Sequence, residues 1–156
     1  MKARLSIMRR LRRFARKERG TQLVELAIVL PIFVLLFAAT AEFGRFFYTY
    51  TTLSKATRSA ARYITTGVKE GAAADDKATN LAVYGNAAGT GDPLVYGLGS
   101  QHISITRTGS TWAPERVTVR VEGYTYQPIF DIGKFVGNDS LSLNIDVSPS
   151  TTMRFF

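Results

Sequence analysis

Residues 26–41 form an uncharged run, LAIVLPIFVLLFAATA, in which Thr40 is the only polar member. As a helix rising 1.5 Å per residue, this run is about 24 Å long, slightly short of the ~30 Å hydrocarbon core of a bilayer. Residues 21–25, or the aromatic residues after position 42, supply the missing length. A helix that is apolar on every side is difficult to bury in a chain of 156 residues. We therefore expect one transmembrane helix over residues 21–41.

The positive charge of the chain is concentrated before this run. Residues 1–20 hold nine Lys/Arg and one Glu, whereas the rest of the chain has eleven basic and eleven acidic residues. Because Lys and Arg beside a span stay on the cytoplasmic side, we expect residues 1–20 to be a cytoplasmic leader and residues 42–156 to lie outside. A neutral outer part lacks the basic face of nucleic-acid-binding domains, so we expect no nucleic-acid partner.

Two residues distinguish residues 21–41 from a plain anchor. Glu25 places a carboxylate at the start of the apolar run, and at mid-bilayer such a charge costs roughly 2.5–3.5 kcal/mol. No basic residue lies three or four positions away, so the carboxylate either snorkels to the headgroups or has a partner on another chain. Pro31 removes a backbone donor, which predicts a bend or a loosened turn unless the membrane helix tolerates it.

We expect the helix to continue through residues 42–66 as an amphipathic extension. Its apolar side is predicted to cover the outer domain or a neighbouring helix, and the small side chains of Ala60 and Ala61 permit close approach. The stripe consists of Phe43, Phe47, Tyr50, Thr57, Ala61 and Ile64, with Phe46 and Leu53 along one edge.

Residues 67–156 are predicted to form a strand-rich domain. A short helix is expected over residues 72–84, and alternating apolar and polar residues at 103–105, 117–122 and 141–148 predict strands of an antiparallel sheet. With residues 42–66 as its cover, the sheet gives an α+β, pilin-like fold. Five aromatic residues are expected to surround and fill the helix–sheet interface: Trp112, Tyr124, Tyr126, Phe130 and Phe135.

No catalytic equipment is apparent. The chain has no cysteine, and its single histidine, His102, is expected to face solvent, so a Cys nucleophile and a multi-histidine metal centre are excluded. The glycines of residues 85–99 lack the order of nucleotide-binding loops, and there is no GxSxG motif. The adjacent Asp75 and Asp76 diverge on a helix and are poor partners for acid–base work. We expect no enzyme activity, no cofactor and no metal.

The stretch from residue 18 to residue 66 resembles a known family. A basic leader ending in Gly20, then Thr21, and Glu25 as the fifth residue after the glycine look like a type IV prepilin signal. The stretch is similar to the TadE-like family of pseudopilins of the tight-adherence (Flp, type IVb) pilus. The matching residues are Val24-Glu25-Leu26-Ala27, Pro31, Glu42-Phe43-Gly44-Arg45, Tyr48 and Ala60-Ala61-Arg62-Tyr63.

This resemblance implies a pseudopilin or minor pilin that serves pilus assembly, cell adhesion and biofilm formation. A prepilin peptidase of the bacterial inner membrane would cut between Gly20 and Thr21, leaving the outer domain in the periplasm. Glu25 would then pair with the N-terminal amine of a neighbouring subunit. The implied partners are this peptidase, other pilin or pseudopilin subunits and the pilus assembly platform. The mature subunit would be either incorporated into the pilus or associated with it.

Two alternatives stay open. Ala39-Thr40-Ala41 has the small-x-small form of an ordinary signal-peptidase site, which would release a secreted protein beginning at Glu42. An anchor that is never cut would instead leave a signal-anchored periplasmic binding module. The first residue of the mature protein distinguishes these cases, because it is Thr21, Glu42 or Met1.

Overall fold

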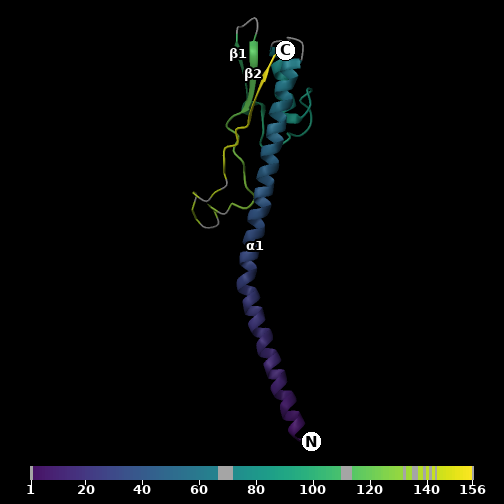
Figure 1. Cartoon of the computed structure of the whole chain (residues 1–156), viewed down its shortest axis with the longest axis vertical. Coiled ribbons are helices and arrows are strands. Elements are labelled where there is room, and N and C mark those ends of the chain that lie inside the picture. Colours follow the sequence, from purple (N-terminus) through teal and green to yellow (C-terminus); the bar gives the residue numbers. More distant parts are fainter. Residues whose placement is uncertain are drawn as a thin grey trace. The chain divides into compact units, whose positions relative to one another are not determined.

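The computed structural model describes residues 2–66, 72–109, 114–131, 133–134, 137–138, 140, 142 and 144–155 (Figure 1). The chain divides into two compact units, Met1–Ala41 and Glu42–Phe156. The elements in chain order are α1 (Lys2–Thr66), α2 (Ala72–Tyr84), the 3₁₀ helix η1 (Ser100–His102), β1 (Ile103–Gly109), β2 (Pro114–Val121) and β3 (Ser150–Arg154).

Helix α1 continues through Pro31 without a break. Proline has no amide hydrogen, so the carbonyl of Ala27 loses its helical partner there. Beyond Ala41 the same helix runs on to Thr66, and this confirms the predicted continuation through residues 42–66. The predicted helix over residues 72–84 is also confirmed, since α2 has these bounds.

The three strands form one antiparallel sheet in the order β1-β2-β3, with β2 in the centre. The register places Ile103 opposite Val121, and Val117 opposite Met153. Along β2, Val117, Val119 and Val121 are almost completely buried, whereas the intervening side chains face the other side. This alternation is the expected signature of a sheet with one buried face.

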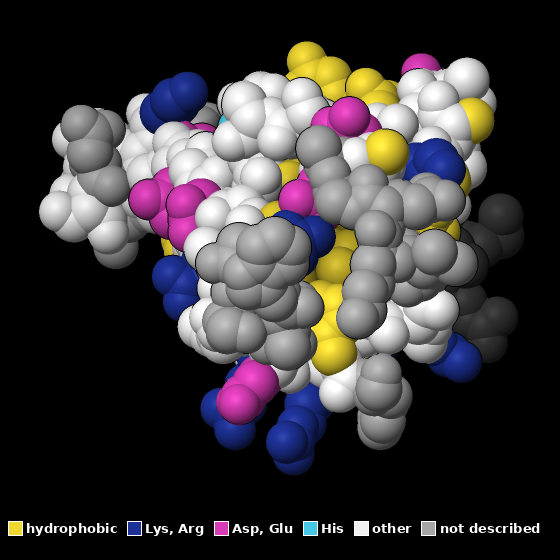
Figure 2. All heavy atoms as spheres, turned by 90° about the horizontal axis from the view of Figure 1, so that it is seen from above, with side chains coloured by type: hydrophobic (Ala, Val, Ile, Leu, Met, Phe, Trp, Pro, Cys, Tyr) yellow, Lys and Arg dark blue, Asp and Glu magenta, His cyan; other side chains and the backbone are white. Residues whose placement is uncertain are grey.

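Residues 42–66 of α1 cover the buried face of the sheet. Small side chains allow the close approach, because Ala60 and Ala61 are fully buried. They belong to a cluster formed by Ala60, Ala61, Ile64, Ala78, Ala82, Val117 and Val119. A helix packed on an antiparallel sheet makes the fold α+β, as predicted. On the face shown in Figure 2, hydrophobic side chains reach the surface only in patches among polar and charged ones.

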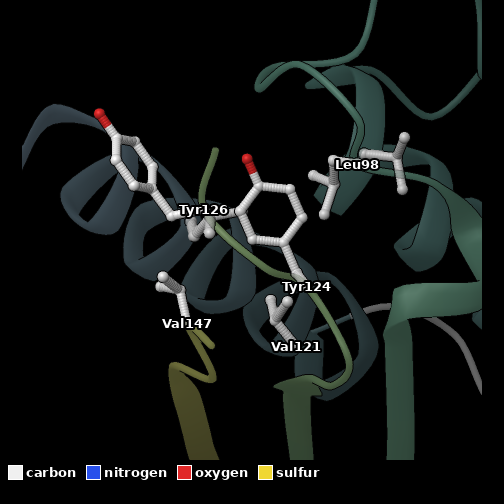
Figure 3. Close-up of a cluster of buried hydrophobic side chains, with 7 residues drawn as sticks. Leu98, Val121, Tyr124, Tyr126 and Val147 are labelled. Atoms are coloured by element: carbon white, nitrogen blue, oxygen red, sulfur yellow. The ribbon is translucent and has the colours of Figure 1, made fainter. Parts of the chain in front are cut away.

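A second buried cluster joins α1 to the segments that flank the sheet (Figure 3). It consists of Leu53, Val83, Leu98, Val121, Tyr124, Tyr126 and Val147. The prediction that aromatic residues fill this interface is confirmed for Tyr124 and Tyr126, whereas Phe130 is 54% exposed. Trp112 and Phe135 lie outside the described residues.

The third strand differs from the prediction. In the described part of 141–148 the pairing is reduced to a bridge between Thr125 and Asp146. The amide of Val147 donates to the carbonyl of Tyr124, yet Ile145 is 43% exposed, so the alternation does not mark a buried face here. Strand β3 follows at Ser150–Arg154 instead.

Candidate functional site

The apolar part of α1 is not covered by the chain itself. The large hydrophobic side chains from Leu23 to Phe37 are 51% to 77% exposed, apart from Val29, which is half-buried. Among the described residues, Gly20–Thr66 is the one helical segment long and apolar enough to cross a membrane, and none of its most apolar window is buried. Because water is a poor environment for so much apolar surface, this helix requires lipid or other helices around it.

Gly20 lies inside α1 at the start of this surface, and the fold gives no reason for a glycine there. A Cβ added to Gly20 would meet no atom within 4 Å, and its backbone is helical. Glycine in a helix interior costs about 1 kcal/mol relative to alanine. Gly44 is equally unconstrained, with no atom within 4 Å of an added Cβ, and serves as an internal comparison.

Glu25 lies on the same exposed helix surface, and Thr21 precedes it by one helical turn. Both residues are exposed, and side chains four positions apart share a helical face. Among the residues that the structure describes, Glu25 has no hydrogen-bond or ion-pair partner. The carboxylate predicted to serve assembly is therefore accessible to a group from outside the chain.

A second carboxylate, Glu42, is only 1% exposed and lies at the start of the outer unit. Its Oε1 accepts hydrogen bonds from the hydroxyl of Tyr126 and from the amide of Ile129, the latter at 3.2 Å. Its Oε2 accepts from the amide of Phe130 at 3.2 Å. The guanidinium of Arg45, one turn later on α1, lies 3.5 Å from Oε1. Glu42 thus binds residues 126–130 to α1 through charge-assisted hydrogen bonds.

Tyr126 is the side chain that faces this carboxylate. Burial of the phenol, together with its hydrogen bond to Glu42, raises the pKa of Tyr126 from 10.0 to about 12. The hydroxyl is therefore protonated at neutral pH and donates to the carboxylate. The ring of Tyr126 also packs edge-to-face against Phe46, with 5.4 Å between the ring centroids.

Sequence reasoning did not assign this role to Glu42. The available signal was an acid directly after an apolar run, with an arginine three positions later. Its principal partner is 84 residues away in the chain, and no local pattern connects the two.

The structure separates the residues predicted for helix packing into two groups. Ala60 and Ala61 are fully buried within the outer unit. Phe43, Phe47 and Tyr50 are 55%, 61% and 45% exposed. Ala60 and Ala61 therefore pack inside the subunit. The three aromatic side chains are accessible for contacts outside the chain.

Two titratable groups near the sheet, His102 and Asp75, have structural partners. His102 does not simply face solvent, because its Nδ1 accepts the amide of Gly99 at 3.0 Å and its ring packs against Tyr124. Asp75 pairs with Arg107 rather than with its neighbour Asp76. Within the described part of the chain, no group of three metal-ligating side chains is found.

Residues 20–62 match the family model described as TadE-like protein. This match confirms the resemblance stated from the sequence. It covers Gly20, Glu25 and Glu42, and it ends within α1, before the first strand. The match indicates a protein associated with the Tad pilus. Neither the curated proteins nor the solved structures contain a match to this chain.

Proposed function

We propose that this protein is a pseudopilin or minor pilin that acts in the biogenesis of a type IVb (Flp/Tad) pilus. The observation that carries the proposal is the helix after Gly20, whose large side chains from Leu23 to Phe37 are uncovered by the chain. A helix of this kind suits a subunit that resides in a membrane and then packs among other helices. The TadE-like match over residues 20–62 supports the same assignment.

In this proposal a prepilin peptidase cuts between Gly20 and Thr21. Gly20 has open space around it and no conformational need for glycine, which supports a requirement imposed by another protein. The cut would remove nine Lys/Arg and leave a subunit whose charges balance. A cut after Ala41 is less compatible with the fold, because the new N-terminal residue would be Glu42, which is buried and accepts the amides of Ile129 and Phe130.

The proposed location is the bacterial inner membrane, with the basic leader in the cytoplasm and residues 42–156 in the periplasm. The cations of the leader support this orientation, since each basic residue near an anionic leaflet contributes about 1 kcal/mol. The partners are the peptidase, the assembly platform and other pilin or pseudopilin subunits. We propose no enzymatic role.

The mature N-terminus tests processing. Mass spectrometry of the protein from cells that carry the pilus system should give a chain that begins at Thr21. Gly20→Leu should abolish the cut, and the chain should keep its leader. Gly44→Leu is the matched control, since Gly44 also lies in α1 with open space around it, and this variant should still begin at Thr21. A wild-type chain beginning at Glu42 or at Met1 would contradict the proposed processing.

A further inference from the structure

Four large apolar side chains near Glu42 are more than half exposed. They are Phe43 (55%), Phe47 (61%), Ile129 (66%) and Phe130 (54%), and we call them the apolar collar. Removing a side chain of this size from water is worth about 1.5–3 kcal/mol. A group of such side chains on an otherwise folded unit marks a surface that contacts another phase or molecule.

The collar is assembled by Glu42. The carboxylate accepts the backbone amides of both Ile129 and Phe130, and so fixes this segment against α1 while leaving the two side chains outside. Phe43 and Phe47 are one turn apart and therefore lie on one face of α1. A buried carboxylate is costly unless its hydrogen bonds are made, and here they hold apolar side chains at the surface rather than in the core.

We propose that the apolar collar contacts the membrane at the boundary between lipid headgroups and acyl chains. The inference rests on the proposed span of residues 21–41. Phe43 and Phe47 follow Ala41 by only two and six residues in the sequence, so the connectivity of the chain keeps them close to the end of the proposed span. Amphipathic and aromatic side chains favour this depth of the bilayer.

The charges beside the collar suit a lipid surface. The side chain of Arg45 is 48% exposed, and Lys134 is exposed in the segment that follows Phe130. The nearest acid of that segment, Asp131, is half-buried, and its carboxylate accepts the hydroxyl of Ser142 and the amides of Gly133 and Lys134. The guanidinium of Arg45 also lies 3.5 Å from the buried carboxylate of Glu42, and exposed cations are attracted to anionic headgroups.

The test uses tryptophan fluorescence in the full chain reconstituted into vesicles of phosphatidylethanolamine and phosphatidylglycerol. Trp112 is the only tryptophan, so Trp112→Phe gives a silent background. Phe130→Trp then reports on the collar and Phe33→Trp on the span. Brominated lipids quench tryptophan at the depth of the bromine. The collar reporter should lose most of its emission to bromines near the headgroups, and the span reporter to bromines near the bilayer centre.

The two reporters separate failure of the collar from failure of the span. Quenching of Phe33→Trp without quenching of Phe130→Trp would overturn the collar and leave the span intact. Absence of quenching in both would overturn the span itself. A blue shift of Phe130→Trp that depends on the protein-to-lipid ratio, without quenching, would assign the collar to a second copy and would also overturn the lipid contact.

Glu42→Gln, added to the Phe130→Trp chain, tests the positioning role of the carboxylate. An amide retains one acceptor atom, so it cannot serve both backbone amides and the phenol as the carboxylate does. Quenching near the headgroups should weaken while circular dichroism shows that the helices are retained. Glu115→Gln makes the same change at an exposed site and should leave quenching unchanged. Equal quenching in wild type and Glu42→Gln would overturn the role of Glu42.

Discussion

At the scale of single residues, the two carboxylates of the apolar half of α1 differ in what their own chain gives them. Glu25 is exposed and, within the described part, unpaired, whereas Glu42 is buried with three donors and a nearby guanidinium. The stabilising bonds of Glu42 are made inside the subunit. Glu25 is left either to reach the headgroups or to pair with a group of another chain. The fold therefore assigns a structural role to Glu42 and leaves Glu25 accessible for the assembly role that we propose.

The contact between Glu42 and Tyr126 predicts a loss of stability at high pH. In the unfolded chain the phenol loses its proton near pH 10.0, whereas in the folded chain its pKa is about 12. Between these values the folded state binds more protons, so the free energy of unfolding must fall as pH rises. Each unit of difference between the folded and unfolded pKa corresponds to about 1.4 kcal/mol in the free energy of unfolding. Urea unfolding in detergent micelles, followed at a series of pH values from neutral upward, measures this fall.

Two conservative variants isolate the contribution of Tyr126. Tyr126→Phe removes the titrating group and should flatten the decline between pH 10 and 12. It should also lower stability at neutral pH by about 1 kcal/mol, because the carboxylate loses a hydrogen bond. Tyr48→Phe makes the same change where the side chain is 69% exposed and should leave the profile unaltered. An equal decline in all three proteins would contradict the assignment.

At the scale of the elements, the ion pair between Asp75 and Arg107 connects α2 to β1. Arg107 follows Ile103 and Ile105 on the inward face of β1, at the end where the carboxylate of Asp75 is available. Its Nη1 donates to Asp75 Oδ2 at 2.8 Å, and Nη2 donates to Oδ1. The hydrogen bond to Asp75 raises the pKa of Arg107, so the guanidinium is charged at every practical pH.

A double-mutant cycle with Asp75→Asn and Arg107→Gln should give a coupling energy of about 0.2–1 kcal/mol, because the pair is partly exposed. The side chains of Arg107 and Asp75 are 33% and 31% exposed. The coupling should shrink when salt is added, since screening acts on exposed charges. Asp76→Asn is the matched control, because Asp76 is exposed beside Asp75. Coupling of Asp76 to Arg107 of the same size would show a general charge effect rather than this ion pair.

The elements show which parts of the structure were accessible from the sequence. Residues 21–66 of α1 and the strand β2 follow from the apolar run and from periodic patterns, and Val117, Val119 and Val121 identify the buried face directly. Helix α2 was predicted from weaker signals, namely acids near its start and apolar residues near its end. Strand β3 was missed because its inward residues are Thr151 and Met153 rather than branched apolar ones. Thr151 bonds instead to the hydroxyl of Thr57 on α1, at 3.0 Å. Such a polar contact depends on tertiary placement and leaves no periodic signal.

In the candidate site, too, some residues could be identified from the sequence and others only from the folded structure. Gly20, Thr21 and Glu25 were selected from a short stretch that resembles a prepilin signal, and their roles in processing and assembly stay predictions. The partners of Glu42 could not be identified in this way, because residues 126–130 meet α1 only after the outer unit has folded. In the sequence, a carboxylate directly after an apolar run could equally well be exposed to solvent or buried. Only the structure shows that Glu42 is buried.

At the scale of the whole molecule, the described part of the outer unit satisfies its buried polar groups, whereas the groups proposed to serve assembly are open. In the described part of the chain, no buried side-chain polar atom lacks a hydrogen bond. The open groups are the apolar surface from Leu23 to Phe37 and the carboxylate of Glu25. Apolar surface alone allows helices to slide along and around one another, because such contacts are not directional. A single charge in that surface would select one axial register.

We therefore expect Glu25→Ala to impair assembly and to leave processing and folding intact. The proposed partner is the N-terminal amine of a neighbouring subunit, and opposite charges attract far more strongly in a low-dielectric environment than in water. Pilus output by electron microscopy and the mature N-terminus by mass spectrometry are the two readouts. Glu115→Ala removes an exposed acid of the outer unit and should leave both unchanged. A Glu25→Ala strain with normal pili would contradict the assembly role, since the apolar surface would then suffice to set the register by itself.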